Sequence, residues 1–88
     1  MKKDIKKSLE RRISIISGQV RGIQEMIENE KYCVDIITQV EAVREALSSV
    51  GNLVMQNHLE THVMHQIKNG EESKAIKEML KIYNLKSK

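Results

Sequence analysis

Hydrophobic residues recur at intervals of three and four along the first third of the chain. This spacing predicts one apolar face of an amphipathic helix, because an α-helix turns once in about 3.6 residues. The stretch 29–32 contributes nothing to this stripe, so we expect a turn there. The residues of the first stripe are Leu9, Ile13, Ile16, Val20, Ile23 and Ile27.

A second stripe with the same spacing is longer. It continues toward His62 and His65 and predicts a helix over about residues 33–68, a length typical of coiled-coil-like packing. Asn69 and Gly70 then form a helix-stop signal. The stripe consists of Cys33, Ile36, Val40, Val43, Leu47, Val50, Val54 and His58.

A third, shorter helix is expected after this stop. Glu71 and Glu72 suit the positive first turn of a helix. Few residues interrupt any of the helices, because the chain has no proline and only four glycines. We therefore predict an all-α protein of two long helices and one short helix, in a single domain over residues 1–88. The shared face of the third helix carries Ile76, Met79, Leu80 and Tyr83.

Length and composition narrow the class of protein. The 88 residues are 40% hydrophobic and 31% charged, which is typical of a soluble globular chain, and so short a monomer buries little surface, which favours self-association. No apolar run approaches the roughly 20 residues of a membrane span, and the N-terminal stretch lacks the apolar region of a secretory signal. One cysteine excludes an intrachain disulfide. We expect a cytoplasmic protein that does not enter a membrane.

Several function classes are disfavoured. Two tyrosines, with no phenylalanine or tryptophan, are too few for a module that reads single-stranded nucleic acid by stacking. The chain has no glycine-rich phosphate loop, no Ser/His/Asp order and no paired-carboxylate motif. We therefore predict that the protein is not an enzyme and has no small organic substrate.

A candidate metal site lies on the second helix. His58 and His62 are four residues apart, which brings two imidazoles to the same side of a helix. Cys33 precedes them by 25 and 29 residues, and about 100° per residue puts it within roughly 20° of each in azimuth. Along a straight helix, however, Cys33 and His58 are about 37 Å apart at about 1.5 Å per residue, so they cannot share one ion within that helix.

An antiparallel dimer removes this difficulty. With a two-fold axis near residues 45 to 48, each Cys33 would face His58 and His62 of the partner, giving two equivalent sites. One thiolate and two imidazoles suit Cu(I) and Zn(II), and also accommodate Ni(II) or Co(II). Cys33 lies near a helix N-terminus, where the helix dipole favours the thiolate. His65 is about 10 Å beyond His58 along the axis, and we interpret it as a structural or outer residue.

Basic residues concentrate in the first helix. Residues 1–21 hold seven basic and two acidic side chains, a net of +5 in a chain whose total is +3. Repeated in an oligomer, this segment would give a broad basic surface of the kind that binds duplex phosphates. A charged run is more often a solvated helix face, so charge alone supports DNA binding weakly. The basic residues are Lys2, Lys3, Lys6, Lys7, Arg11, Arg12 and Arg21.

Over essentially its whole length, the chain resembles the CsoR/RcnR family of bacterial transcriptional repressors, which includes copper, nickel/cobalt and formaldehyde sensors. Three strings carry the resemblance: RRISIISGQVRGIQEMIE at 11–28, YCVDIITQVEAVREAL at 32–47 and HLETHV at 58–63. It implies an antiparallel four-helix-bundle dimer that assembles into a disc-shaped tetramer, with Cys33, His58 and His62 as the inter-subunit metal ligands.

The resemblance also implies roles for residues outside the ligand set. Tyr32 and Glu78 match positions that surround the metal ligands in copper sensors of the family. Arg12 and Arg21 match DNA-contacting or DNA-proximal arginines, Arg44 is a further candidate, and Lys6 and Lys7 belong to the same basic segment. No helix-turn-helix signal is present, so phosphate contacts and groove shape are the expected mode of DNA recognition.

Departures from the family pattern bear on the inducer. Copper sensors usually have a cysteine where this chain has His62, although a Cys-His-His set is also known among them. Nickel/cobalt sensors add a histidine near the N-terminus, where this chain reads Met1-Lys2-Lys3-Asp4. Persulfide sensors need a second cysteine at the position of His58. Formaldehyde sensors use the cysteine with an N-terminal amine.

We therefore predict a repressor that binds operator DNA in the metal-free form and is released by a metal, Cu(I) before Ni(II), Co(II) or Zn(II). One alternative is a formaldehyde-responsive repressor that uses Cys33 and does not need His62. An alternative of another class is a helical interaction module without DNA binding, which predicts neither an operator nor stoichiometric metal.

Overall fold

The computed structural model describes residues 1–87, and every element in that range is helical. Contacts between residues divide the chain into two compact units, one from Lys2 to Leu53 and the other from Val54 onward with Met1. The prediction of an all-α chain is confirmed, while the single domain over residues 1–88 stays a prediction. The helices are α1 (Lys3–Glu28), α2 (Cys33–His58), the π-helical turn η1 (Leu59–Val63), α3 (Met64–Lys68) and α4 (Glu72–Lys86).

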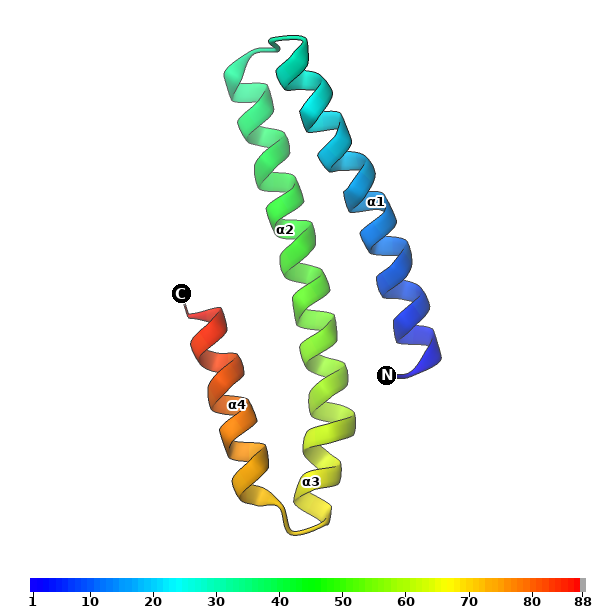
Figure 1. Ribbon diagram of the computed structural model, residues 1–88, viewed down its shortest axis with the longest axis vertical. Helices are drawn as coiled ribbons and strands as arrows, with labels where there is room; N and C mark the ends of the chain where they lie inside the picture. Colours follow the sequence, from blue (N-terminus) through cyan, green and yellow to red (C-terminus); the bar gives the residue numbers. More distant parts are fainter. Residues whose placement is uncertain (88) are drawn as a thin grey trace. The chain divides into compact units, whose positions relative to one another are not determined.

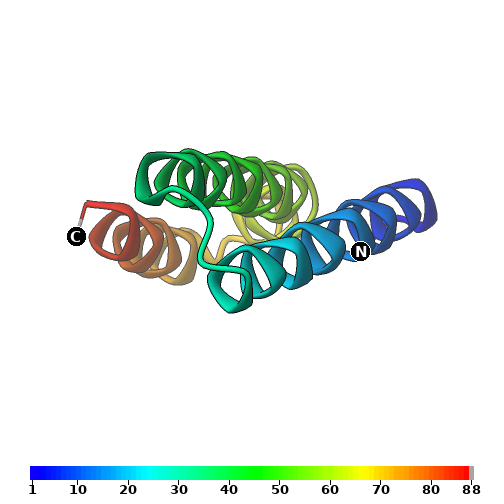
Figure 2. The same ribbon diagram turned by 90° about the horizontal axis from the view of Figure 1, so that it is seen from above.

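In the first unit, α1 and the part of α2 up to Leu53 form an antiparallel helical hairpin (Figures 1 and 2). Leu9 and Ile16 from α1 and Val43 from α2 are buried, each at most 8% exposed, as their places in the two stripes predict. Other stripe members remain exposed, however, including Val40 at 42% and Leu47 at 48%. The hairpin therefore buries only part of the apolar surface that the helices carry.

In the second unit, the helical run that ends at Lys68 is followed by α4, which returns antiparallel to it (Figure 1). Val63 and Ala75 are 4% and 2% exposed and form the centre of the packing. Of the predicted shared face of α4, Ile76 and Leu80 are each 57% exposed, whereas Met79 and Tyr83 line a groove together with residues of α2 and η1. Ala75 is the buried residue of α4, and Glu78 and Ile82, three and seven positions later, are half-buried.

The predicted helix over residues 33–68 is confirmed as a continuous helical run, but it is not α-helical throughout. At η1 the turn widens, and the backbone N–H of Met64 donates to the carbonyl of Leu59, five residues earlier. Such π-turns are uncommon and often lie at functional sites. This one contains His62, one of the candidate ligands.

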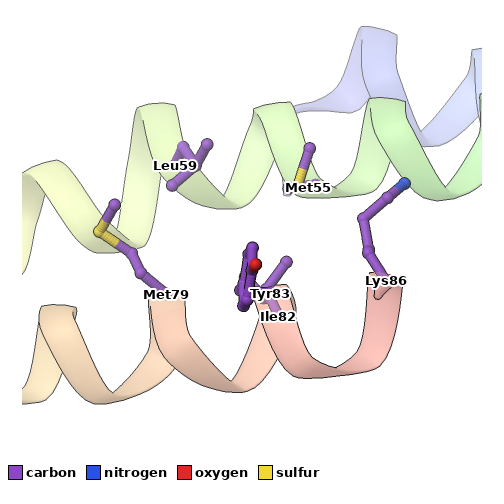
Figure 3. Close-up of a pocket in the computed structure, with 6 residues that line it drawn as sticks. All are labelled: Met55, Leu59, Met79, Ile82, Tyr83 and Lys86. Atoms are coloured by element: carbon purple, nitrogen blue, oxygen red, sulfur yellow. The ribbon is translucent and has the colours of Figure 1, made fainter. Parts of the chain in front are cut away.

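An apolar groove of about 310 Å³ lies in the second unit (Figure 3). Its walls come from the end of α2 and η1 on one side and from α4 on the other. The thioethers of Met55 and Met79 project from opposite walls, which agrees with a packing role for these methionines. The groove is lined by Met55, Leu59, Met79, Ile82, Tyr83 and Lys86.

Both predicted turns are Schellman motifs, in which a residue with positive φ follows the helix end. At the end of α1 this residue is Glu30 (φ 50°), and the N–H of Lys31 donates to the Met26 carbonyl at 2.9 Å. At the end of α3 it is Gly70 (φ 75°), and the N–H of Glu71 donates to the Gln66 carbonyl at 2.7 Å. The same backbone turn is thus made once by glycine and once by a residue with a side chain.

No helix within residues 1–87 is long and apolar enough to cross a bilayer.

Introducing glycine at the first turn and removing it from the second should have opposite effects on stability. An L-residue in the left-handed region costs about 1–2 kcal/mol, and glycine loses about 0.5–1 kcal/mol more chain entropy on folding than alanine. Glu30→Gly should therefore raise the free energy of unfolding by about 0.5 kcal/mol, while Gly70→Ala should lower it by about 1 kcal/mol. Urea unfolding followed by circular dichroism at one protein concentration measures both. A loss of stability in Glu30→Gly would contradict this view of the first turn.

Candidate metal centre

The two candidate histidines lie side by side at the junction of α2 and η1. His58 is the last residue of α2, and His62 is the fourth residue of η1. Their ring centroids are 5.0 Å apart and the ring planes are 22° from parallel. The spacing of four residues therefore brings the imidazoles together, as the sequence predicts, even though the turn between them is wider than an α-helical turn.

Glu78 of α4 anchors the His58 ring. The Nε2 atom of His58 is 2.7 Å from the Oε2 atom of Glu78, and the two residues are 20 positions apart in the chain. The other carboxylate oxygen, Oε1, accepts a hydrogen bond from the side-chain amide of Gln66 at 3.1 Å. Both oxygens of Glu78 are thus bound to the helical run that faces α4.

These contacts determine the proton positions. Hydrogen bonds from Gln66 and then from His58 hold the pKa of Glu78 below its ordinary value, against a smaller opposing effect of burial. The carboxylate is therefore an acceptor at neutral pH, and His58 Nε2 must carry the proton that it donates. In neutral His58 the lone pair is then on Nδ1, the nitrogen left for a metal ion.

His62 has a neighbour of its own. The hydroxyl of Thr61 donates to the backbone carbonyl of Asn57 at 2.7 Å, and its Oγ1 atom lies 3.1 Å from Nδ1 of His62. Asn57 is only 4% exposed, and its Oδ1 atom has no hydrogen-bond partner. The two histidines thus differ in their surroundings, one next to a carboxylate and the other next to a hydroxyl.

Cys33 is the first residue of α2, and its side chain is exposed. The carbonyl of Tyr32 accepts the N–H groups of Asp35 and Ile36, which starts the helix, and the Tyr32 side chain is 69% exposed. Cys33 belongs to the first unit, whereas both histidines belong to the second. Within residues 1–87 of the single chain, no three Cys, His, Asp or Glu side chains are grouped closely enough to hold a metal.

The third histidine is engaged elsewhere. His65 lies in α3, where the side-chain amide of Asn69 donates to its Nε2 atom at 2.9 Å. This contact is at the exposed end of the helix. The interpretation of His65 as a structural or outer residue stays a prediction, and His65 offers a natural control for the other two histidines.

The predicted DNA-binding residues are all exposed, but they are not equivalent. Lys6 is 3.9 Å from Glu10, and Arg44 is 3.3 Å from Glu41, so both have acidic neighbours. Arg12 and Arg21 are nine residues apart on α1, and at about 100° per residue they lie on opposite sides of the helix. Arg21 shares its side with Lys7, which is 14 residues earlier and within roughly 40° in azimuth.

Two contacts around the histidines are absent from the sequence-based prediction. Gln66 follows His62 by four residues, the same interval that joins His58 to His62. This interval could have predicted that Gln66 lies on the same side of the helix as the two histidines. Thr61 is adjacent to His62, and adjacent residues on a helix do not face one another. No sequence pattern indicates that its hydroxyl reaches the imidazole of His62.

Comparisons with known proteins agree on one family. The family profile described as metal-sensitive transcriptional repressor matches residues 5–84. The copper-sensing transcriptional repressor CsoR of Bacillus subtilis is 41% identical over 78 residues, which cover 89% of this chain and 77% of the relative. RicR of Mycobacterium tuberculosis, also a copper-sensing repressor, is 43% identical over 60 residues, which cover 68% of this chain and 62% of RicR, less than two thirds of its length.

A solved structure shows the same fold. The copper-sensing repressor CsoR with Cu(I) from Geobacillus thermodenitrificans is similar with a TM-score of 0.93 and 31% sequence identity. The similarity covers 100% of this chain and 92% of that one. The predicted resemblance is thereby confirmed in sequence and in structure.

The anchoring of Glu78 predicts how its pKa responds to substitution. Gln66→Ala removes the largest cause of the lowered pKa, so the Glu78 pKa should rise toward its ordinary value. The stabilisation that the ionised carboxylate contributes is present above the ordinary pKa and is lost as pH falls through the lowered one. In Gln66→Ala this stabilisation should therefore be smaller, and its loss should be complete at a higher pH. Carboxyl-carbon NMR titration of the metal-free protein measures the pKa directly.

Gln56→Ala is the matched control, because Gln56 makes a similar amide-to-carboxylate contact with Glu60 at 3.0 Å, away from Glu78. It should leave the Glu78 titration unchanged. An unchanged Glu78 pKa in Gln66→Ala would mean that the amide does not stabilise the carboxylate.

Proposed function

This chain belongs to the family of metal-sensitive transcriptional repressors, and from that premise we propose that it binds operator DNA when metal-free and is released when Cu(I) binds. The observation that carries the proposal is the 2.7 Å contact between His58 Nε2 and Glu78. It leaves the lone pair of neutral His58 on Nδ1, beside a second imidazole, in a chain similar to copper-sensing repressors. The family consists of repressors, and the chain is not an enzyme.

The proposed ligands are Cys33, His58 and His62. A thiolate with two imidazoles is a soft donor set, which suits Cu(I). The similarity of this chain to copper-sensing repressors favours Cu(I) as its metal over Ni(II), Co(II) or Zn(II). When bound, Cu(I) would link the thiolate to the two imidazoles. The exposed position of Cys33 at the start of α2 leaves its thiol accessible to a second chain.

We propose that Cys33 comes from a second copy of the chain. The chain exposes apolar side chains at helical spacing, among them Val40 and Leu47 on α2, which is typical of surfaces that other chains cover. An antiparallel four-helix-bundle dimer would cover this stripe and bring each Cys33 to the partner's histidines. Two such dimers would form the disc-shaped tetramer, and residues 1–88 would act as one domain within it.

Glu78 and Tyr32 have supporting roles in this proposal. Glu78 fixes the ring orientation of His58 and, as a charged acceptor, raises the basicity of the opposite nitrogen. Because Glu78 belongs to α4 and His58 to α2, the orientation of the ring and the position of α4 depend on each other. Tyr32 directly precedes Cys33 and would lie against the completed site.

The basic segment of α1 would provide the DNA-binding surface. Its residues Lys6, Lys7, Arg12 and Arg21 are all exposed in the single chain, as is Arg44 of α2, the further candidate. Contacts from such residues to phosphates position a protein on the duplex, while groove shape contributes sequence preference. A repressor of this kind works in the cytoplasm with the chromosome, and double-stranded operator DNA and further copies of the chain are its proposed partners.

Metal binding and DNA binding would then be linked. If Cu(I) lowers the affinity for the operator by some factor, the operator lowers the affinity for Cu(I) by the same factor. The chain's part in this coupling is to hold His58, and through Glu78 also α4, in the arrangement that one of the two ligands prefers. A ligand without such a preference would shift nothing.

Ligand substitutions test the metal site. Cys33→Ala and His62→Ala should retain operator binding but lose Cu(I)-driven release, because loss of a ligand weakens a site by more than the 10–100-fold typical of outer residues. His65→Ala is the control and should respond as the wild type does. Anaerobic fluorescence anisotropy with DNA from the protein's own promoter region provides the readout.

The same titration separates the alternatives. Release of the wild-type protein by formaldehyde, with His62 dispensable, would move the protein to the electrophile-responsive class. Release by Ni(II), Co(II) or Zn(II) but not by Cu(I) would replace the proposed metal. Failure to bind any promoter DNA at low salt would overturn the repressor proposal.

Charge removal on α1 tests the DNA surface. Lys7→Ala and Arg21→Ala should each weaken binding by a similar factor on all sequences and reduce the salt dependence of log K by about one. Lys81→Ala, which removes a positive charge from α4, should leave this slope unchanged. Equal slopes in all three variants and the wild type would exclude the side of α1 that carries Lys7 and Arg21 from the DNA-binding surface.

A further inference from the structure

The hydroxyl of Thr61 is the feature next to the histidine pair that the proposed function leaves unexplained. Its Oγ1 atom is 2.7 Å from the Asn57 carbonyl and 3.1 Å from Nδ1 of His62. We propose that Thr61 is a positioning residue that holds neutral His62 in the Nδ1–H tautomer and so presents Nε2 to the metal. The inference rests on the proposed role of His62 as a ligand, but its first consequence is a property of the metal-free protein.

The proton count on the hydroxyl supports this assignment. A threonine hydroxyl has one proton to donate and two lone pairs that accept. The Asn57 carbonyl has no proton, so the short contact to it must use the hydroxyl proton of Thr61. Toward His62 the hydroxyl then has only lone pairs to offer. Nδ1 of His62 must therefore be the donor, and the remaining lone pair of a neutral His62 is on Nε2.

His58 is held in the opposite way. Its Nε2 atom lies 2.7 Å from the Glu78 carboxylate, whose other oxygen accepts from Gln66, so Nε2–H donates and the lone pair of neutral His58 is on Nδ1. The two imidazoles, 5.0 Å apart, thus offer different nitrogens from two successive turns of the same helical run. Two outer contacts, one from a carboxylate and one from a hydroxyl, would select this pair of ligand atoms before the metal arrives.

Thr61 and His62 both lie in η1, where the N–H of Met64 reaches the carbonyl of Leu59 five residues back. Thr38 makes the same kind of hydroxyl contact in ordinary α-helix, donating to the Val34 carbonyl at 2.8 Å, and has no adjacent histidine. The hydroxyl-to-backbone contact alone is therefore a common helical feature. The imidazole next to it gives Thr61 its proposed role.

The test is the tautomer of His62 in the metal-free protein. Full-length protein labelled with ¹⁵N-histidine is measured by long-range ¹H–¹⁵N correlation NMR, at a pH where the imidazoles are neutral. The wild type should show a protonated Nδ1 on His62 and a protonated Nε2 on His58. Thr61→Val, which keeps the shape but removes the hydroxyl, should shift His62 toward the Nε2–H tautomer and leave His58 unchanged.

Two further variants separate positioning from folding. Thr61→Ser retains a hydroxyl and should restore the wild-type tautomer, and Thr38→Val removes the comparable hydroxyl of α2 and should change neither histidine. The Cu(I) affinity, measured by competition with a chelator, should fall about tenfold in Thr61→Val and stay unchanged in the other two. The Thr38→Val control thus reports any general effect of losing a helical hydroxyl.

The outcomes distinguish this inference from the proposed function. An Nε2–H tautomer of His62 in the wild type, or an unchanged tautomer in Thr61→Val, would overturn the role of Thr61 even if Cu(I) releases the operator. The predicted tautomers in a protein that does not bind Cu(I) would instead preserve the positioning by Thr61 and refute the proposed metal.

Discussion

The hydrogen bond between His58 and Glu78 is the interaction on which the candidate site depends. It joins α4 to the end of α2 at 2.7 Å and determines which nitrogen of His58 stays available. Gln66 donates a hydrogen bond to the other carboxylate oxygen, so both oxygens of Glu78 are held in place. A change in the position of α4 would therefore act on His58, the proposed metal ligand, and metal binding at His58 would act on α4. The His58–Glu78 hydrogen bond therefore connects the candidate metal site directly to the packing of α4 against the end of α2.

A second constraint is that the chain leaves much of its apolar surface uncovered. Only five hydrophobic residues are buried within residues 1–87, while both long helices expose others from the stripes that should pack. Cys33 is exposed as well, and it belongs to a different unit from the histidine pair. Both observations support assembly with further copies of the chain. In that assembly the metal site and the interface would be completed together.

Much of the fold follows from hydrophobic spacing and stop signals. The stripes predict both long helices, and the turns at 29–32 and at Asn69 and Gly70 lie where the stripes end. The packed face of α4 is only partly predictable in this way, because its buried residue is the small Ala75, while the larger Ile76 and Leu80 are exposed. Spacing of large hydrophobic residues thus identifies a helix more reliably than it identifies the partner that the helix packs against.

The site was predictable to a similar extent. The interval of four residues brings His58 and His62 together, and the family resemblance identified Glu78, which the sequence pattern alone would leave on the surface. The π-helical turn has no sequence signal here, because an interval of four pairs residues in either kind of turn. The contact of Thr61 with His62 emerges only from the structure, because adjacent residues on a helix do not ordinarily face one another.

In the proposed metal site, one chain supplies the thiolate and another supplies the imidazoles. Subunit mixing tests this most directly, with Cys33→Ala and His62→Ala chains co-expressed and the Cu(I) stoichiometry measured anaerobically. In a mixed antiparallel dimer one site combines both substitutions and the other combines none, so random mixing should restore about a quarter of wild-type Cu(I) binding, while each variant alone restores none. Failure of the mixture to bind more Cu(I) than the separate variants would contradict an inter-subunit site.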